Sequence, residues 1–519
     1  MEKQIAIIGA GVSGLLACKY LVSKGFDPIV FEARSNIGGV WTKTIETTKL
    51  QTPKPAYQFS DFPWPDSVTE EYPSQRLVQD YVCSYATHFD LLRHIKFNTK
   101  VIGIKYEGPP AGDEEMQAWS LWGGNGEPFS SRGKWILETQ NSAILSTEVY
   151  QVDFVILCVG RFSDVPNLPE FHPDKGPEAF NGEVIHSVDY SNMDNETARN
   201  FVKGKRVAVV GFQKSAMDIA MECSAANGVE HPCTVLYRTE HWNVPDYYPW
   251  GVHLAYLYCN RFSELMVHKP GEGFLLSLLA TILTPLRWAS SKFVETYIRN
   301  KLPLSKFGMV PSHSFLQELS SCLTSTVPDG FYDNVEEGSI ILKKAPSFSF
   351  CQEGIKVNDE DKPLESDLVI LATGFKGEEK LRDIFVSTTF QKHIIGSADA
   401  PVPLYRECIH PRIPQLAVIG FSESLTNLYT SEIRSRWVAE FLDGTFKLPS
   451  IKEMEQDIAQ WHMYMKRYSG KNYRRSCIGG LQIWYNDQLC KDMGWNPKRK
   501  KGFFADLFQP YGPADYVSP

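Results

Sequence analysis

Three glycines and one glutamate near the N-terminus have the types and spacing that bind a dinucleotide. Gly9-Ala10-Gly11-Val12-Ser13-Gly14 is a G-x-G-x-x-G run, and Glu32 lies eighteen residues after its last glycine. Gly9 permits a tight turn, Gly11 lets a pyrophosphate approach the backbone, and Gly14 lets a helix pack close to a sheet. A carboxylate at Glu32 accepts hydrogen bonds from ribose hydroxyls and repels a 2′-phosphate. The run therefore predicts a site for FAD or NAD.

The elements that must position this run are those of a βαβ unit. Lys3–Ile8 is an apolar strand, the alanine- and leucine-rich segment up to Lys24 is a helix, and Pro28–Phe31 is a second strand that leads into Glu32. This order places a pyrophosphate at the N-terminus of the helix, where free N–H groups and the helix dipole favour negative charge.

A second, altered unit begins near residue 206. Arg206–Val210 is a strand, Gly211-Phe212-Gln213-Lys214-Ser215-Ala216 is the turn into a helix, and Gln213 stands where a second glycine is usual. The next strand ends at Arg238, in the place that Glu32 holds in the first unit. A guanidinium suits a 2′-phosphate, so this unit predicts NADP. Glu240 is near enough in sequence to be the partner of Arg238 instead.

Two similar strands suggest how the units are connected. Residues 153–160 and 367–375 share an acid, an apolar strand and a terminal glycine, and they bracket the second unit. We therefore predict an α/β fold with two Rossmann-like dinucleotide-binding domains, the NADP domain inserted into the FAD domain, and a helical C-terminal cover. The predicted boundaries are 1–165 for the first part of the FAD domain, 166–335 for the NADP domain with an aromatic and apolar insertion at about 240–330, 336–450 for the second part of the FAD domain, and 451–519 for the C-terminal cover.

Composition excludes several classes of function. The net charge of −8 over 519 residues argues against a nucleic-acid binder, which normally carries a basic face. The eleven cysteines are scattered without a C-x-x-C pair. We therefore predict neither a metal site nor the redox-active disulfide of a reductase, and expect the cysteines to be small buried residues of a reducing compartment.

The most apolar segment is too short to cross a membrane. Phe274–Leu286 has thirteen residues, whereas a span needs roughly twenty. We expect a buried or interfacial helix, with contact to a membrane surface as the alternative. The basic cluster of residues 498–501 is either an anionic contact or a solvated loop. The N-terminus enters the first strand almost at once, which predicts no signal or transit peptide. The sequence does not predict the oligomeric state.

The chain resembles the flavin-containing monooxygenases from Gln4 to about Tyr511. Phe180-Asn181-Gly182-Glu183-Val184-Ile185-His186-Ser187-Val188-Asp189-Tyr190 matches the F-x-G-x-x-x-H-x-x-x-Y/F sequence of that family, and Leu371-Ala372-Thr373-Gly374-Phe375 matches its L-A-T-G-Y/F strand. The loop 46–65 and the turn at Gly211 are most similar to the plant defence branch, whose best-known activity is N-hydroxylation of pipecolic acid.

The resemblance implies an FAD-dependent NADPH monooxygenase. NADPH would reduce FAD, O2 would add to flavin C4a, and a small nucleophilic amine nitrogen or sulfur would attack the resulting C4a-hydroperoxyflavin. The cofactor carries the difficult chemistry, so the protein positions the reactants and excludes water. No catalytic triad or carboxylate pair is then required.

The resemblance also assigns residues. His186 would order the linker between the domains, and Gln51 would be the catalytic residue, since its amide can support the oxygenated flavin where many animal members carry asparagine. The cofactor contacts would be Gly9, Ala10, Gly11, Val12, Ser13, Gly14, Glu32, Gly39, Val40, Trp41, Val101, Thr373 and Gly374 for FAD, and Gly211, Phe212, Gln213, Lys214, Ser215, Ala216 and Arg238 for NADP.

Several alternatives remain at this stage. One is a decarboxylating flavin monooxygenase of a 2-oxo acid, of the auxin-pathway type, and another is a flavoprotein dehydrogenase or reductase that does not oxygenate. A third is a redox-sensing scaffold that binds dinucleotide without turnover. The substrate pocket is expected from the loop 46–65, the insertion and the stretch after Gly420, with Lys49 and Arg434 available to bind a substrate carboxylate. The predicted location is the cytoplasm, with association with the endoplasmic reticulum as an option.

Overall fold

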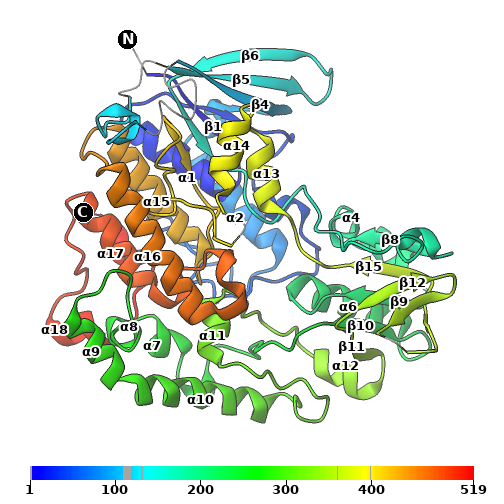
Figure 1. The fold of residues 1–519 in the computed structure, drawn as a ribbon. Helices are drawn as coiled ribbons and strands as arrows, with labels where there is room; N and C mark the ends of the chain where they lie inside the picture. The colour runs from blue at the N-terminus through cyan, green and yellow to red at the C-terminus, as the bar shows by residue number, and fades with distance from the viewer. Residues whose placement is uncertain (1–2, 109–117, 130–132, 359, 398, 519) are drawn as a thin grey trace.

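Two parallel sheets form the centres of two domains, and the second domain projects to the right in Figure 1. The structure is a computed structural model, and it describes residues 3–108, 118–129, 133–358, 360–397 and 399–518. This arrangement confirms the predicted fold class of two Rossmann-like domains with a helical C-terminal part.

The first sheet contains the predicted FAD unit. Its strand order is β16-β7-β1-β2-β3, with β1 at Ile5–Ile8, β2 at Ile29–Phe31, β3 at Ile95–Lys96, β7 at Phe154–Leu157 and β16 at Leu416–Val418. Its pairings are parallel, and every residue of β1 and β7 is buried. Strands that are covered on both faces need apolar side chains at successive positions, which explains their continuous apolar runs. The helices α1 (Val12–Ser23) and α15 (Asn427–Leu442) pack together beside this sheet.

The second sheet contains the predicted NADP unit. Its order is β11-β10-β9-β15-β8, with β8 at Glu183–His186, β9 at Val207–Val210, β10 at Cys233–Tyr237, β11 at Ile340–Lys344 and β15 at Leu368–Leu371. Its helices include α4 (Ser187–Ser191), α5 (Asn195–Val202), α6 (Lys214–Asn227) and α12 (Phe331–Glu337). The chain passes from β7 into this sheet and returns to the first sheet at β16, so the second domain is inserted into the first.

The predicted return to the first domain at residue 336 is too early. The strand β11 pairs with β10, and β15 pairs with both β9 and β8, so the second sheet continues to Leu371. The repeated pattern at 367–375 therefore belongs to the second unit. β15 stands beside β9 as β7 stands beside β1. The pattern identifies the strand next to a nucleotide turn, but a local pattern cannot say to which sheet that strand belongs.

Two small antiparallel sheets complete the β-structure. One has the order β4-β5-β6, with β4 at Thr99–Glu107, β5 at Lys134–Asn141 and β6 at Thr147–Val152. The other has the order β12-β13-β14, with β12 at Phe348–Cys351, β13 at Gly354–Val357 and β14 at Leu364–Glu365. The first lies at the top of the molecule in Figure 1, and the second lies in the inserted domain.

The insertion of residues 240–330 is largely helical. It contains α7 (Leu254–Tyr258), α8 (Arg261–Leu265), α9 (Phe274–Ile282), α10 (Thr284–Lys301) and α11 (Phe315–Ser320), drawn in green at the bottom of Figure 1. Of the two expected placements of the apolar segment, buried or interfacial, burial does not hold for the start of α9, where Phe274 and Leu275 are 79% and 78% exposed. Among the described residues, no single helix is long and apolar enough to cross a membrane, and α9 with α10 reaches that length only as a pair bent by 48°.

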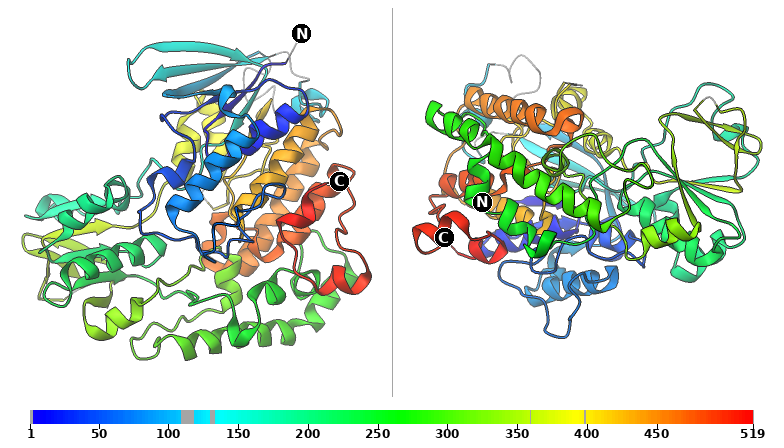
Figure 2. Two further views of the ribbon diagram at one scale, coloured as in Figure 1. Left: turned by 180° about the vertical axis from the view of Figure 1, so that it is seen from behind. Right: turned by 90° about the horizontal axis from the view of Figure 1, so that it is seen from below.

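The C-terminal segment covers the first domain with helices. These are α16 (Ile451–Ser469), α17 (Gln482–Asp492) and α18 (Phe503–Phe508), in orange and red in Figure 2. The helix α16 begins at a capping box, in which Ser450 Oγ accepts the N–H of Glu453 at 3.2 Å and the Glu453 carboxylate accepts the N–H of Ser450 at 2.9 Å. The tail is held by Arg436, whose guanidinium donates to the carbonyls of Tyr516 and Val517 at 2.6 and 2.8 Å.

Candidate functional site

The turn after β1 has the geometry that its glycines require. Gly9 has φ +102°, and a Cβ on it would lie 2.6 Å from the carbonyl oxygen of Cys158 on the neighbouring strand. A Cβ on Gly14 would lie 1.8 Å from the carbonyl oxygen of Gly9, so only glycine lets α1 start this close to the strand. Ala10 is buried, and Val12 and Ser13 form the first turn of α1.

Glu32 fastens this turn to the second strand. Its carboxylate is buried and accepts the backbone N–H of Ala10 at 2.7 Å and that of Arg34 at 3.0 Å. The carbonyl of Glu32 accepts the N–H of Thr99, two residues before Val101 in β4. The structure therefore brings Val101 to the same strand end as Glu32. The predicted contacts of Glu32 with a ribose and of Val101 with adenine stay predictions.

A second glycine approaches the first turn from the chain that follows β2. A Cβ on Gly39 would lie 3.0 Å from the Cα of Gly11, and one on Gly11 would lie 3.4 Å from the Cα of Gly39. The two backbones therefore face each other without side chains between them. Such bare backbone is what the binding of a pyrophosphate and its flavin needs. Val40 is about half exposed at this edge, and Trp41 Nε1 donates to the Tyr57 hydroxyl at 2.7 Å.

The turn after β9 repeats this geometry in the second domain. Gly211 has φ +134°, and its Cβ would meet the carbonyl oxygen of Ala372 at 2.5 Å, as the Cβ of Gly9 would meet that of Cys158. Gln213 precedes α6, and its Nε2 is buried without a hydrogen-bond partner. Phe212 and Ala216 are buried, and Ser215 is in the first turn of α6. An orphaned amide donor at a helix N-terminus suits a bound phosphate oxygen.

The side chains predicted to bind the NADP phosphates differ in their contacts. Lys214 Nζ is held 2.5 Å from the Asp218 carboxylate, four residues along α6. Arg238 is exposed just after β10, and its guanidinium makes no ion pair within the described ranges. Glu240 bonds to Lys344 at 2.5 Å, so the alternative in which Glu240 neutralises Arg238 is not the arrangement found.

The strand β15 delivers Thr373 and Gly374 to the seam between the domains. Thr373 Oγ1 donates to the carbonyl of Asn167 at 2.5 Å. His186 Nδ1 accepts the N–H of Val188 at 3.1 Å, so the ring proton lies on Nε2, which donates to the Gly374 carbonyl at 3.0 Å. Burial lowers the pKa of His186 and favours this neutral form. His186 therefore has a structural role, since its ring connects the start of α4 to the Gly374 backbone.

Gln51, the predicted catalytic residue, has an unsatisfied side chain. Its Oε1 is buried without a hydrogen-bond partner, while its backbone carbonyl accepts the Thr326 hydroxyl at 2.7 Å. This amide oxygen can accept a hydrogen bond from a bound group. The catalytic role of Gln51 stays a prediction.

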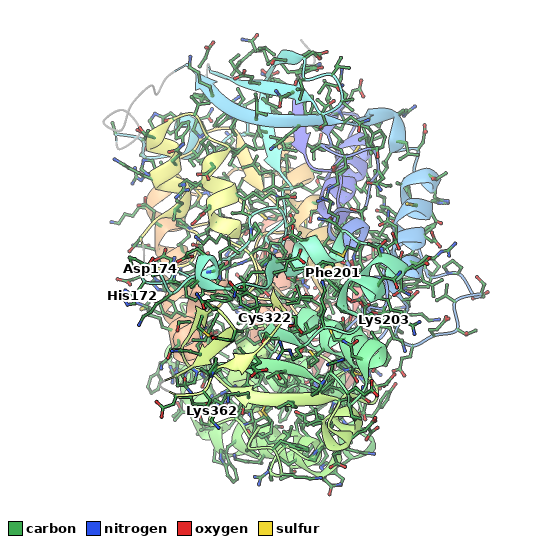
Figure 3. The ribbon with its side chains drawn as sticks, turned by 90° about the vertical axis from the view of Figure 1, so that its right-hand side faces the viewer. His172, Asp174, Phe201, Lys203, Cys322 and Lys362 are labelled. Atoms are coloured by element: carbon green, nitrogen blue, oxygen red, sulfur yellow. A yellow bond between two sulfur atoms is a disulfide. The ribbon has the colours of Figure 1, made fainter. Side chains whose placement is uncertain are left out.

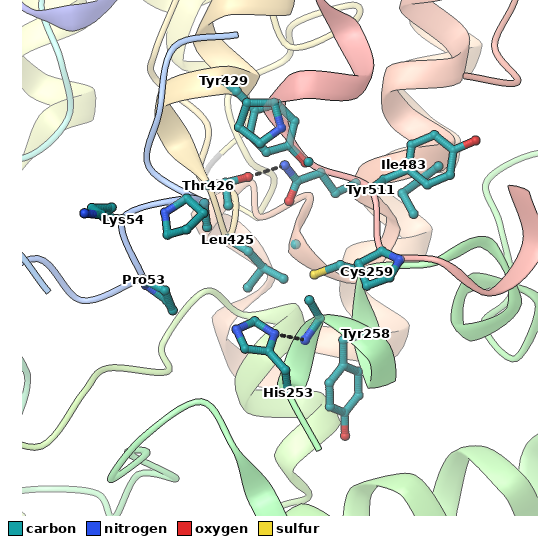
Figure 4. Close-up of a pocket in the computed structure, with 18 of the residues that line it drawn as sticks. Pro53, Lys54, His253, Tyr258, Cys259, Leu425, Thr426, Tyr429, Ile483 and Tyr511 are labelled. Carbon is teal, nitrogen blue, oxygen red and sulfur yellow. Dashed lines mark hydrogen bonds between the residues drawn. The ribbon is translucent and has the colours of Figure 1, made fainter. Parts of the chain in front are cut away.

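A cavity of about 460 Å³ begins two residues after Gln51. Its wall comes from all three predicted segments and also from the C-terminal cover, as Figure 4 shows for Pro53, His253, Leu425 and Ile483. The remaining lining residues are Lys54, Pro55, Ala56, Thr69, Glu71, Tyr248, Ala255, Tyr258, Cys259, Glu264, Thr426, Tyr429, Gly479, Gln482, Pro510, Tyr511, Gly512 and Pro513.

Two titratable side chains in the cavity wall have shifted pKa values. Burial raises the pKa of the Glu264 carboxyl to about 7, although the N–H groups of Ile483 and Trp484 donate to it at 2.7 and 2.8 Å and lower that pKa. Burial also lowers the pKa of His253. Both shifts favour the neutral form of the side chain, so the wall around Glu264 and His253 disfavours charge, whereas Lys54 and Glu71 line another part of the cavity.

Comparison with known proteins identifies the family. A family model described as flavin-binding monooxygenase-like matches residues 2–507. The chain belongs to the flavin-binding monooxygenase-like family. Over 519 residues it is 41% identical to a probable flavin-containing monooxygenase 1 of Arabidopsis thaliana, covering 99% of this chain and 96% of the relative. It is 26% identical to the N-oxide-forming dimethylaniline monooxygenase 2 of Mus musculus, covering 98% and 85%. A solved steroid monooxygenase bound to NADP shares its fold, with a TM-score of 0.66 at 17% identity over 95% and 98% of the two chains.

FAD and NADPH are the cofactors of this flavin-binding monooxygenase. The described residues fit them, because a Cβ on Gly11 or Gly39 would crowd the backbone that faces it and the amides of Gln51 and Gln213 each carry an unpaired buried atom. Bound FAD, reduced by NADPH, supplies the activation of O2. The individual cofactor contacts remain those predicted from the sequence.

The monooxygenase has a tie between its domains that the sequence did not reveal. Thr48 Oγ1 donates to Asp218 of α6 at 2.6 Å, and Thr47 donates to Glu222 of the same helix. Together with the hydrogen bond from Thr326 to the Gln51 carbonyl, these bonds anchor the segment 46–51 to α6 and to the insertion of the second domain. Short polar residues in an irregular loop give no sequence signal for such partners.

The two cations suggested for a substrate carboxylate do not reach the cavity. Arg434 is buried and donates to the Tyr485 hydroxyl at 2.8 Å and to the Ser422 carbonyl at 3.2 Å. Lys49 is exposed and lies 3.6 Å from Asp329. Lys54 does line the cavity, and its Nζ donates to the carbonyl of Val68.

Proposed function

We propose that this monooxygenase oxygenates a small nucleophilic nitrogen or sulfur, with a cyclic amino acid such as pipecolate as the first candidate. The mostly apolar cavity that begins two residues after Gln51 carries the proposal, because it gives such a substrate a binding place formed by the three segments expected to line the substrate pocket. The name of the mouse relative, which forms an N-oxide, supports an amine nitrogen. The similarity to the plant defence branch supports N-hydroxylation and a role in defence.

The cavity favours the reactive form of an amine. An amine attacks oxygen through its lone pair, so it must be unprotonated. The burial that raises the pKa of Glu264 also disfavours an ammonium ion in the same surroundings. The chain therefore removes the proton from the substrate by desolvation and needs no dedicated base. The apolar wall also keeps water from the reacting atoms.

Lys54 is the cation that the cavity offers to a substrate carboxylate. Its side chain lines the wall, and its only hydrogen bond within the described part of the chain is to a backbone carbonyl. A carboxylate would give it a stronger, charge-assisted partner. We assign Lys54 to binding an amino-acid substrate, with no role for a substrate that lacks a carboxylate.

Product analysis with the FAD-loaded enzyme and NADPH tests this function. We expect products that gain one oxygen atom from a cyclic amino acid or from a thioether. Lys54→Met should raise KM for the amino acid roughly 10-fold, the worth of a charge-assisted bond, and leave KM for a tertiary amine unchanged. The measurement is mass spectrometry of the products beside O2 uptake.

Other results would support the other functions. Release of CO2 from an indole 2-oxo acid would favour the decarboxylating type, and NADPH oxidation without an oxygenated product from any of these compounds would favour a dehydrogenase. Equal changes of KM for the amino acid and the tertiary amine in Lys54→Met would contradict the assignment of Lys54.

We further propose that the chain is cytoplasmic and docks on an anionic lipid surface such as that of the endoplasmic reticulum. The docking face consists of α9 and α18. In α18, Phe503 and Phe504 are 70% and 76% exposed, and α8 joins the two helices by packing against both. Seen from below, this face lies at one end of the molecule (Figure 2). Exposed contiguous apolar patches mark interaction sites in otherwise well-packed proteins.

Charge selects the lipid surface as the occupant of the docking face. Lys498 and Lys501 are exposed directly before Phe503, and neither forms an ion pair with any residue that the structure describes. A pair of lysines beside inserted aromatic rings suits anionic headgroups above an acyl boundary.

Vesicle sedimentation tests the docking face. We expect the holoenzyme to bind vesicles in which phosphatidylserine is diluted with neutral lipid, and not vesicles of neutral lipid alone. Binding should be lost in the double variant Phe503→Ser, Phe504→Ser, and at high salt. Ile144→Ser with Leu145→Ser is the matched control, because those side chains are 73% and 68% exposed beyond β5 at the opposite end. Binding to neither vesicle type, together with self-association that the phenylalanine variant removes, would assign the face to a second copy instead.

A further inference from the structure

Two cysteines far apart in the sequence are joined beside the cavity. Cys322 and Cys477 form a disulfide with their Cα atoms 5.7 Å apart and a sequence separation of 155 residues. Cys322 follows α11 of the insertion, and Cys477 precedes α17 of the C-terminal cover, so the bond links these two parts near the middle of the molecule (Figure 3). For these two cysteines, the predicted role as small buried thiols is wrong. The cause is that two isolated cysteines carry no pairing signal.

The surroundings of Cys477 accommodate the reduced form as well. Its Sγ lies 3.6 Å from the carbonyl oxygen of Leu319 and 3.4 Å from the backbone nitrogen of Gly479. A free thiol there could donate to the carbonyl and accept from the N–H. Opening the bond would therefore leave the Cys477 thiol with hydrogen-bond partners in the folded protein.

At least two of the other cysteines are poorly suited to redox chemistry. The nine free cysteines in the described part of the chain include Cys18 and Cys408, where burial raises the pKa of the thiol to about 12. Thiolate is the reactive form, so these side chains are inert at neutral pH. Cys322 is half-buried whereas Cys477 is 1% exposed, so an external thiol reaches the Cys322 sulfur first.

The bond lies directly behind the cavity wall. A Cβ on Gly479, which lines the cavity, would lie 3.3 Å from Cys477 Sγ and 3.2 Å from the side chain of Leu425, another lining residue. On the other side, Thr326 follows Cys322 by four residues and holds the carbonyl of Gln51. The disulfide thus connects the two segments that hold the wall and the Gln51 loop in place.

We propose that Cys322 and Cys477 are a reversible thiol–disulfide pair that tightens the cavity wall when closed. In opening, a thiolate of a dithiol reductant attacks Cys322 Sγ, the S–S bond breaks, and Cys477 Sγ takes the electron pair and a proton. The second thiol of the reductant then displaces Cys322, so the reductant becomes a disulfide. In closing, one cysteine attacks H2O2 to give a sulfenic acid and water, and the other cysteine displaces a second water from that sulfur.

Opening the pair should loosen the wall and admit water to the cavity. We expect dithiothreitol to lower the Tm of the FAD-loaded enzyme by roughly 3 to 6 °C through release of a long loop. We expect the share of NADPH oxidation that ends in free H2O2 to rise about twofold as water enters the cavity. The first effect concerns the pair alone, while the second also rests on the proposed oxygenation.

Alkylation and mass spectrometry of the holoenzyme provide the test. After peroxide treatment, Cys322 and Cys477 should resist alkylation, and dithiothreitol should make both reactive without unfolding the protein. Cys322→Ser and Cys477→Ser should each fix the lower Tm whatever the redox state, whereas Cys351→Ser, at a half-buried free cysteine, should keep the full response. Labelling of both cysteines after peroxide, resistance of the native bond to dithiothreitol, or an unchanged Tm on reduction would each overturn the proposal. The alkylation and Tm results do not depend on the substrate, so they separate failure of the pair from failure of the proposed oxygenation.

Discussion

Gly14→Ala is expected to yield protein without bound FAD. The added Cβ would lie 1.8 Å from the carbonyl oxygen of Gly9, a contact that only a shift of α1 away from β1 can relieve. That shift would remove the helix N-terminus from the position where a pyrophosphate binds. The absorbance spectrum of the purified variant measures the effect, and we expect the yellow colour to be lost together with all NADPH oxidation.

Two companion variants separate loss of the cofactor from general misfolding. Gly273→Ala adds a Cβ that meets no atom within 4 Å at a residue with negative φ, and it should keep both flavin and activity. Gly211→Ala would place a Cβ 2.5 Å from the Ala372 carbonyl in the second unit, so it should keep FAD and lose NADPH binding. A yellow, active Gly14→Ala enzyme would show that the first turn is not the flavin site.

Arg238→Ala is expected to remove the preference for NADPH over NADH. The guanidinium is exposed at the end of β10 and is not engaged by Glu240, so it is available to a 2′-phosphate. Loss of a charge-assisted contact to a phosphate should raise KM for NADPH roughly 10- to 100-fold. KM for NADH should change little, because NADH carries no 2′-phosphate.

The control is Lys343→Ala, on the neighbouring strand. Lys343 is paired with Glu360 at 2.7 Å, so its removal should leave both KM values as they are. Steady-state kinetics with the two cofactors measures the comparison. If Arg238→Ala raised KM for NADPH and NADH by the same factor, Arg238 would not recognise the phosphate.

The sequence predicted the βαβ units and their close glycine turns, which short segments encode. Gly9, Gly14 and Glu32 lie within one βαβ unit, so their spacing in the sequence determines the local arrangement that the structure shows. The same holds for Gly211 and Arg238 in the second unit. The fold class and the insertion of one domain into the other followed from the two units and the repeated strand pattern.

The remaining parts depend on contacts between distant segments. The cavity wall combines Pro53, His253, Ile483 and Pro510, and no local pattern relates these positions. The position of β15 was misassigned, because pairing with β9 or with β7 would need the same apolar strand. The sequence left open whether α9 is buried or interfacial, because its apolar residues alone do not show which other segments cover it.

The anchors on segment 46–51 also restrict how the two nucleotide domains can swivel. Thr48 is bonded to Asp218 and the Gln51 carbonyl is bonded to Thr326, so this strip of the first domain is fastened to the second. Any hinge motion that widens the seam must break these bonds or carry Gln51 with it. Widening of the seam and the position of the predicted catalytic amide are therefore mechanically linked.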